Sequence, residues 1–337
     1  MRNYFRNTLN PENFHGHGKH PVFFEGWYFK LVDAQAKQSI AVIPGIFLAR
    51  TPERTQAFIQ VFDGANGAVI FVPFPENEFR AKPDKFDIHI GENYFSASQI
   101  SLKINHPDIQ LNGSLTFRNI ETCPITLLSP GIMGWYAWAR FMQCYHGVVS
   151  LDHEIAGELT LNAETIDFSG GRGYIEKDWG KSFPESWVWL QCNHFGESGI
   201  SVTASIAIIP WIRGAFPGFI MGFLHRGKLY RFATYTGARI EKFEVFEHST
   251  TIIVRDNHNR LSMEILHSGD AGMLFAPTES GMIRRIPESL NAAVDVCLES
   301  VRGSEIKTIF EARGRPAGFE FVGDIPKLIS MWQANRN

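Results

Sequence analysis

The stretch Gly170–Gln191, GGRGYIEKDWGKSFPESWVWLQ, joins two candidate β-strands and shows where the chain divides. Glycines at its start permit positive φ, as a turn between strands requires. In an extended segment Tyr174, Glu176 and Asp178 point to the same face, because side chains two apart share a face. Carboxylates are seldom placed beside so much aromatic surface without a reason. The stretch is therefore a connection between strands that also carries a candidate active site.

Short β-branched or aromatic runs separated by Gly, Asn, Asp or Pro continue along almost the whole chain. Examples are FFEGWYFKLVD (residues 23–33), SIAVIPGIFLA (39–49) and GISVTASIAIIP (199–210). Strands at such close spacing are typical of β-barrels and sandwiches. The sequence predicts an all-β protein with little helix.

One segment favours a helix, DIPKLISMWQA at residues 324–334. Asp324 can cap its N-terminus, and Leu328, Ile329 and Trp332 recur at helical spacing. We expect helix only in small amounts, and this segment is its best candidate.

A weak internal repeat indicates two similar domains. In each half a Trp-containing strand is followed by a polar turn and an apolar strand, and the closing parts also correspond. The paired segments are 26–33 with 186–193, 39–45 with 199–210, and 170–180 with 314–324. The repeat predicts two tandem antiparallel β-barrels, residues 1–184 and residues 185–337.

Composition excludes several classes of function. A net charge of -3 gives no electrostatic basis for nucleic acid binding. No window approaches the roughly 20 apolar residues of a membrane span, and the N-terminus lacks the apolar run of a signal peptide. The four cysteines have no CxxC spacing and are interpreted as free thiols. We expect a cytoplasmic protein, peripheral to a membrane at most.

The N-terminal run HGHGKH places His15, His17 and His20 close together in sequence. Its glycines and the proline that follows favour a flexible leading segment over a metal site. We predict no metal here or elsewhere.

The connection at residues 127–159 interrupts the strand rhythm and concentrates aromatic and ionisable residues. Trp135, Tyr136, His146 and Asp152 are its candidate site residues. A long connection of this kind is either packed beneath the barrels or functional. Both interpretations stay open from the residues alone.

Four motifs resemble the tocopherol cyclase family, and the similarity runs over nearly the whole chain. They are FFEGWYFK, GWYAWARFMQCYHGVVSLDHEIAG, GGRGYIEKDWGKSFPESWVWLQCNHF and EARGRPAGFEFVG. The resemblance implies that both barrels are lipocalin-like, as in the related carotenoid 1,2-hydratases and some decalin-forming fungal cyclases. In the hydratases a Tyr-His-Asp-His-Asn run stands where this chain has YIEKD. Tyr174 thus matches the Tyr, Glu176 takes the place of the Asp implicated as proton donor, and Asp178 replaces the Asn.

The reaction that this resemblance implies is acid-catalysed cyclisation of a prenylated benzoquinol to a chromanol. The alkene is protonated, and the neighbouring phenol oxygen captures the tertiary cation. The reaction requires no cofactor and no metal, only an acid and a dry aromatic pocket that folds the prenyl chain. The implied partner is a hydrophobic prenylated small molecule, collected through transient contact with a membrane surface.

Residue roles follow from this chemistry. A carboxyl buried against indole rings keeps its proton near neutral pH, which suits Glu176 between Tyr174 and Trp179. Asp178 is either the partner of Glu176 or itself the donor. Further substrate-binding candidates are aromatic, for cation–π stabilisation, or polar. These are Trp27, Glu25, Trp135, Tyr136, His146, Asp152, Trp179, Trp187 and His194.

Several candidates have a plainer interpretation. Glu25 is expected either to pair with a basic residue or to join the site, and Lys177 to be solvated or salt-bridged. His146 and Asp152 either orient the phenol and accept its proton or bond loop backbone. The same pocket also suits a hydratase, a pericyclic cyclase or a non-catalytic isoprenoid carrier.

Overall fold

The computed structural model describes residues 2–19, 21–268, 271–278 and 281–334. The chain forms two compact units, one of Met1–Phe183 with Gly272–Ile286 and one of Pro184–Ala271 with Pro287–Asn337. In the described part of the chain both units are built from antiparallel strands, with few helices. The all-β expectation is confirmed.

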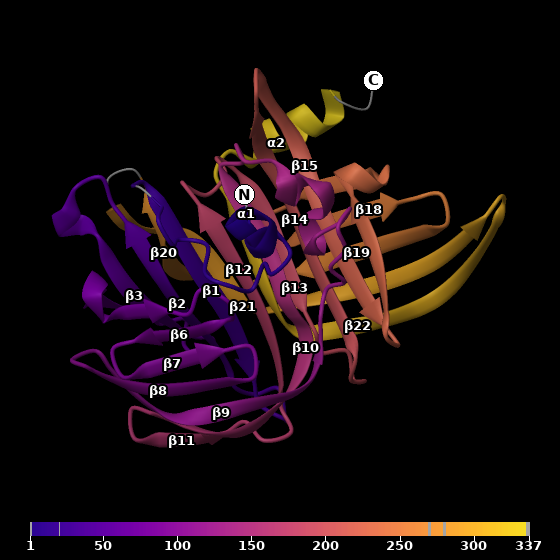
Figure 1. Cartoon of the computed structure of the whole chain (residues 1–337). Helices are drawn as coiled ribbons and strands as arrows, with labels where there is room; N and C mark the ends of the chain where they lie inside the picture. Colours follow the sequence, from indigo (N-terminus) through magenta and orange to yellow (C-terminus); the bar gives the residue numbers. More distant parts are fainter. Residues whose placement is uncertain (1, 20, 269–270, 279–280, 335–337) are drawn as a thin grey trace. The chain divides into compact units, whose positions relative to one another are not determined.

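The first unit carries one sheet in the order β4-β3-β2-β1-β12-β10-β9-β8-β7-β6-β5, with β11 on β10. Strand β1, at the start of this unit, pairs with β12, the last strand before the chain passes to the second unit. Strand β10 lies on the other side of β12 (Figure 1). The strands are β1 (Phe23–Val32), β2 (Ser39–Leu48), β3 (Gln56–Asp63), β4 (Val69–Pro75), β5 (Phe79–Ala81), β6 (Asp87–Ile90), β7 (Asn93–Ser96), β8 (Gln99–His106), β9 (Ile109–Glu121), β10 (Cys144–Leu161), β11 (Glu164–Asp167) and β12 (Arg172–Gly180).

The sheet of the first unit wraps around one apolar core. Val72 of β4 and Ile90 of β6, near opposite ends of the strand order, belong to the same buried cluster as Phe29 of β1. A sheet that buries one face in a common core from both ends is curved into a barrel. Alternate residues of each strand therefore point inward and outward.

The second unit repeats this plan with the order β16-β15-β14-β13-β22-β21-β19-β18-β17. Its first strand again pairs with its last, β13 with β22, and Phe232 of β16 shares a core with Ile240 of β17. The strands are β13 (Trp187–Cys192), β14 (Ile200–Trp211), β15 (Gly214–His225), β16 (Lys228–Ala233), β17 (Arg239–Val245), β18 (Ser249–Arg255), β19 (Asn259–Leu266), β21 (Gly281–Arg302) and β22 (Glu305–Val322).

The unit boundary differs from the predicted domain division in one respect. The chain divides between Phe183 and Pro184, but Gly272–Ile286 belongs to the first unit. This segment holds β20 (Gly272–Thr278) and the first residues of β21, with which β20 pairs. Two hydrogen bonds of the Gln60 side-chain amide hold it there, one to the carbonyl oxygen of Phe275 at 3.0 Å and one from its backbone nitrogen at 2.8 Å. Assigning all of residues 185–337 to the second domain therefore needs correction.

Helices are short. They are α1 (Arg2–Thr8), α2 (Ile325–Ala334) and the 3-10 segments η1 (Pro52–Arg54), η2 (Glu76–Glu78), η3 (Gly131–Trp138) and η4 (Thr234–Thr236). The expected C-terminal helix is α2, and Asp324 caps it by accepting a bond from the backbone nitrogen of Lys327 at 2.9 Å. Among the described residues, none of the helices has both the length and the apolar character needed to cross a membrane. The four cysteines are free thiols, as expected.

Candidate active site

The candidate site is built on strand β12, whose two faces carry different groups. Tyr174, Glu176 and Asp178 alternate with Ile175, Lys177 and Trp179. Ile175 and Trp179 belong to the apolar core of the first unit, so their face points into the barrel. The other three side chains therefore lie together on the outer face.

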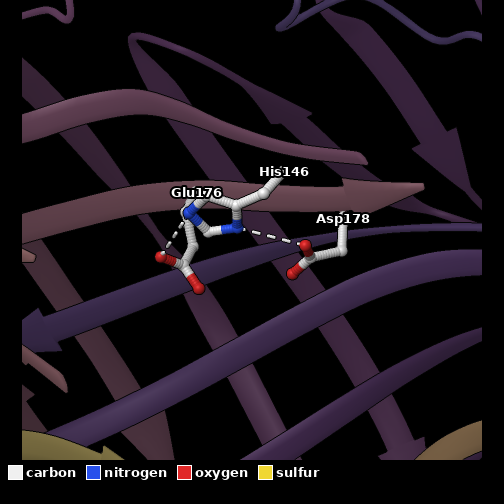
Figure 2. Close-up of side chains that lie close together, drawn as sticks. All are labelled: His146, Glu176 and Asp178. Atoms are coloured by element: carbon white, nitrogen blue, oxygen red, sulfur yellow. Dashed lines mark hydrogen bonds and ion pairs between the residues drawn. The ribbon is translucent and has the colours of Figure 1, made fainter. Parts of the chain in front are cut away.

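His146 joins this outer face from the neighbouring strand. His146 lies directly opposite Asp178 in the β10–β12 ladder, so the two side chains are on the same face of the sheet. The imidazole Nδ1 lies 3.1 Å from Asp178 Oδ1, and Nε2 lies 3.6 Å from Glu176 Oε2. Figure 2 shows the ring between the two carboxylates, with one nitrogen toward each. His146 thus links the two predicted acids.

Tyr174 completes the group from the other side of Glu176. Its hydroxyl donates to Glu176 Oε2 at 2.6 Å, a short bond typical of a donor facing a charged acceptor. Tyr174 is fully buried, whereas the side chains of His146 and Asp178 are 15% and 24% exposed. The four side chains Tyr174, Glu176, His146 and Asp178 therefore form a connected chain on the outer face of β12. Its Tyr174 end is fully buried, and its His146 and Asp178 end is partly exposed to solvent.

The two carboxylates set the protonation of His146. Burial by itself lowers the pKa of its imidazole, but the nearby charges of Asp178 and Glu176 outweigh burial and raise the pKa to about 9. At neutral pH the ring is an imidazolium, which donates from Nδ1 to Asp178 and faces Glu176 as an ion pair from Nε2. The group holds an exchangeable proton between two carboxylates.

His146, Glu176 and Asp178 are also a set that could hold a metal ion, since one ligand atom from each lies within 4.8 Å of the others. A metal ligand must be a neutral imidazole, whereas the two carboxylates favour the protonated ring.

Asp152, predicted as a second polar group of the site, forms an ion pair with Arg172. Arg172 Nε donates to Asp152 Oδ1 at 2.7 Å, and its terminal nitrogen Nη2 donates to Oδ2. Arg172 precedes Tyr174 by two residues on the same strand, so it shares the outer face of β12. The pair therefore extends the row of polar groups beyond Tyr174.

The inner face of β12 holds a separate buried cluster. Lys177 donates to the carbonyl oxygen of Asn13 at 2.6 Å and to Glu25 Oε1, and His15 Nδ1 lies 3.1 Å from both Lys177 Nζ and Glu25 Oε1. Lys177 and Glu25 are fully buried. Glu25 thus has the basic partner that was one of its two expected roles, and Lys177 is salt-bridged rather than solvated.

The leading segment is fixed by this cluster, which corrects the expectation of a flexible start. His15 is buried, its backbone nitrogen donates to Glu25 Oε2 at 2.8 Å, and its ring stacks on Trp179 at 4.2 Å. Buried polar and aromatic contacts of this kind order a backbone. His20, the third histidine of the predicted run, lies outside the described residues.

Two tryptophans expected beside Glu176 lie on the inner face instead. Trp179 is three residues from Glu176, an odd spacing that reverses its direction in a strand. Trp27 pairs with Lys177 in the β1–β12 ladder, and its indole nitrogen donates to the carbonyl oxygen of Glu12 at 3.1 Å. The structure does not bring Trp27 or Trp179 to the carboxylates.

The helical segment η3, in the long connection before β10, contacts His146. Met133 Sδ lies 3.1 Å from the backbone nitrogen of His146. Trp135 and Tyr136 stack on each other with ring centroids 4.1 Å apart, and Trp135 is exposed. The structure places both aromatic residues in η3.

Trp187 and His194 belong to the second unit. The Trp187 indole nitrogen donates to Glu320 Oε2 at 2.6 Å, and His194 Nδ1 lies 3.0 Å from Asn193 Oδ1. Both residues lie on or just after β13 and are positioned by that unit's own strands.

Sequence reasoning missed Tyr28 and Lys30, which lie opposite Glu176 and Tyr174 in the β1–β12 ladder. Cross-strand partners share a face, so both belong to the outer face with the candidate group. Lys30 is fully buried. The alternation of Trp27 with Tyr28 in the motif GWYFK could have revealed them, given the pairing of β1 with β12.

Comparisons with known proteins identify relatives of the chain. Residues 130–323, which include His146, Glu176 and Asp178, match the family model described as tocopherol cyclase-like. A chloroplast protein of Oryza sativa subsp. japonica, described as a probable tocopherol cyclase, is 24% identical over 214 residues, 59% of this chain and 44% of that protein. The chloroplast tocopherol cyclase of Zea mays is 31% identical over 109 residues, 31% of this chain and 23% of that protein. The matched part is thus less than half of each curated relative.

A solved structure shares the fold. The crystal structure of CghA with Sch210972 superposes with a TM-score of 0.56 at 13% identity, over 90% of this chain and 89% of that one. The barrels are lipocalin-like.

Proposed function

Since the chain belongs to the tocopherol cyclase-like family, we propose that it is an enzyme that cyclises a hydrophobic prenylated benzoquinol to a chromanol by acid catalysis. The observation that carries the proposal is the chain Tyr174–Glu176–His146–Asp178 on the outer face of β12. It combines a carboxyl group with donors that stabilise the carboxylate left when its proton departs.

Glu176 is the proton donor in this proposal. It rests as a carboxylate beside the His146 imidazolium and takes up a proton when the substrate displaces water from the site, because loss of water disfavours the charged form. Its proton passes to the less substituted carbon of the prenyl double bond, and the π electrons of that bond form the new C–H bond. The other alkene carbon becomes a tertiary cation. The carboxylate that remains on Glu176 accepts the Tyr174 hydroxyl at 2.6 Å and faces the His146 imidazolium at 3.6 Å. Both interactions strengthen as negative charge develops, which is the condition for catalysis by differential stabilisation.

Ring closure restores the acid. The phenol oxygen donates an electron pair to the tertiary cation, a C–O bond forms, and the phenol proton moves to the Glu176 carboxylate. One proton is added to the alkene carbon and one is lost from the phenol oxygen. The chromanol is therefore an isomer of the prenylated benzoquinol. Asp178 keeps His146 charged throughout and acts as a positioning residue.

The test uses Glu176→Gln with a geranylgeranylated benzoquinol as the probe. The substitution keeps the size of the side chain but removes the transferable proton, so the cyclisation rate falls by about 10²–10⁴-fold. Binding of the probe, measured by tryptophan fluorescence, stays largely intact. Glu158→Gln, an exposed carboxylate on β10, is the matched control and leaves the rate unchanged.

Asp178→Asn distinguishes the two acids. If Asp178 only holds the charge of His146, this variant is milder than Glu176→Gln. A more severe loss in Asp178→Asn would assign the donor role to Asp178. Full activity in both variants would contradict the proposal and assign proton donation to a different acid. No activity in the unsubstituted chain, with the probe still bound, would favour a carrier, and a product heavier by one water would favour a hydratase.

A further inference from the structure

Large apolar side chains are exposed in two segments of the first unit, helix α1 and residues 125–141. We call them the apolar patch, and its members are Phe5, Ile125, Leu127, Leu128, Trp135 and Phe141. Leu128 is 85% exposed and Leu127 is 66% exposed. Adjacent apolar residues at this exposure mark an interaction surface when they gather in one place.

Trp138 joins the two segments into one surface. Its indole nitrogen donates to the carbonyl oxygen of Leu127 at 2.9 Å, and its ring lies 5.2 Å from the ring of Phe5. The Tyr4 hydroxyl donates to the carbonyl oxygen of Trp138 at 2.6 Å. Helix α1 and the residues around Leu127 are therefore held together rather than exposed separately.

The two leucines occupy the tip of a tight turn. Thr126 and Ser129 exchange backbone hydrogen bonds of 3.1 and 3.2 Å, and Ile125 pairs with Pro130 below them. Leu127 and Leu128 are the central residues of this turn, so they project from the surface. A projecting apolar tip needs a matching hollow in a protein partner, whereas acyl chains move aside to admit it.

The two segments that carry the apolar patch contain basic residues and no acidic ones. Between residues 122 and 151 the sequence contains no Asp or Glu, and Arg140 is its one Lys or Arg. Arg140 lies over the Tyr4 ring at 4.1 Å, and the exposed Arg6 follows Phe5 on α1. This basic margin contrasts with a chain that has 35 acidic and 32 basic residues. Arginines beside exposed tryptophan and leucine complement the anionic headgroups and apolar interior of a bilayer surface.

We propose that the apolar patch docks on an anionic lipid bilayer, with Leu127 and Leu128 inserted among the acyl chains and Arg6 and Arg140 at the headgroups. This binding goes beyond the proposed reaction, because it depends on the surface of the first unit and on none of the groups around Glu176. The protein associates with the membrane surface without spanning it.

The experiment is co-sedimentation of the full chain with vesicles of equal parts phosphatidylcholine and phosphatidylglycerol, and with phosphatidylcholine alone. The variant L127S/L128S removes the inserted side chains and weakens partitioning by about tenfold or more. Arg140→Gln weakens binding to the anionic vesicles by about fivefold and leaves binding to phosphatidylcholine nearly unchanged. Ile212→Ser is the matched control, since Ile212 is a 74% exposed side chain in a turn of the second unit.

Folding and self-association are measured beside binding. All four substituted residues are exposed, so thermal unfolding should match the unsubstituted chain. Wild-type sedimentation with anionic vesicles, lost in L127S/L128S and kept in Ile212→Ser, supports the proposal. The proposal is overturned if the unsubstituted chain does not bind vesicles, or if L127S/L128S and Ile212→Ser bind them equally well. It is also overturned if L127S/L128S changes only the mass measured by light scattering, because that result would assign the apolar patch to contact with a second copy of the chain. Vesicle binding is measured without any enzymatic assay. Failure of the membrane-docking proposal can therefore be distinguished from failure of the proposed reaction.

Discussion

The two faces of strand β12 carry ionisable groups of opposite character. On the inner face Lys177 is fully buried and satisfied by Asn13, His15 and Glu25. On the outer face the side chains of His146 and Asp178 keep part of their surface exposed. The comparison shows that burial of charge does not by itself indicate function. A closed ion pair holds a strand in place, whereas a partly accessible group that shares a proton is suited to chemistry.

The electrostatics of the two faces differ in the same way. Burial lowers the pKa of Lys177, while the charges of Lys177 and His15 outweigh burial and hold the pKa of Glu25 below its usual value. On the outer face the pKa of His146 is raised to about 9 despite burial. The inner cluster is a lysine with one carboxylate, whereas the outer group has two carboxylates around one imidazolium.

The largest expected effect comes from breaking the inner pair. Lys177→Met leaves Glu25 buried with His15 as its remaining ionisable partner, so the free energy of unfolding falls by about 3–5 kcal/mol. Glu176→Gln, one residue away on the outer face, should cost much less stability. Urea unfolding followed by tryptophan fluorescence compares the two variants.

The double variant K177M/E25Q is the control for the inner pair. Removing both charges eliminates the unpaired carboxylate and recovers part of the lost stability. Equal stability of Lys177→Met and the unsubstituted chain would contradict the structural role of the inner face.

The next effect is a pH dependence from the outer face. The folded-state pKa of His146 is raised from 6.5 to about 9, so its contribution to stability is fully present below pH 6.5 and is lost as pH rises through about 9. The raised pKa corresponds to a contribution on the order of 3 kcal/mol. The unfolding free energy of His146→Gln should therefore approach that of the unsubstituted chain as the solution becomes alkaline.

Unfolding in urea at several pH values, with both proteins in the same buffers, measures this difference. Groups that do not interact with His146 titrate alike in both proteins and cancel in the comparison, and the paired carboxylates Glu176 and Asp178 are already ionised across the alkaline range in which His146 loses its proton. A difference that stays constant across this range would show that His146 is not the charged centre of the outer face.

The smallest effect tests the bond between Tyr174 and Glu176. Tyr174→Phe removes a single hydroxyl donor, so kcat falls by about three- to tenfold with KM little changed. Tyr145→Phe is the matched control, because the Tyr145 hydroxyl makes an equally short bond of 2.6 Å to the carbonyl oxygen of Ala139 and its ring stacks on Trp179. Equal kcat losses in both variants would mean that loss of packing, not of the donor, causes them.

Local pattern predicted much of this arrangement. The alternation of β12 places Tyr174, Glu176 and Asp178 on one face, and the cap at Asp324 marks the start of α2. The internal repeat corresponds to the shared order of the two sheets, in which β1 pairs with β12 and β13 pairs with β22. These features depend on residues close in sequence or on repeated strand composition, so a single sequence contains them.

Long-range pairing could not be predicted in the same way. His146 reaches Asp178 through a ladder between residues 32 apart, and register shifts interrupt that ladder after Val148. Gln60 holds Phe275 from 215 residues away, so no local signal assigns β20 to the first unit. Nearness in sequence also misled, because Trp179 lies close to Glu176 along the chain but on the opposite face.

The most direct test of the central claim is the position of deuterium after reaction in D₂O. In D₂O the acidic protons of Glu176 and the phenol exchange, so alkene protonation leaves one deuterium on the carbon next to the new C–O carbon of the chromanol. We predict one carbon-bound deuterium per product by mass spectrometry and NMR, and product formation slowed by about 10²–10⁴-fold in Glu176→Gln. Chromanol that forms in D₂O without carbon-bound deuterium would contradict protonation of the alkene by an acid on the outer face of β12.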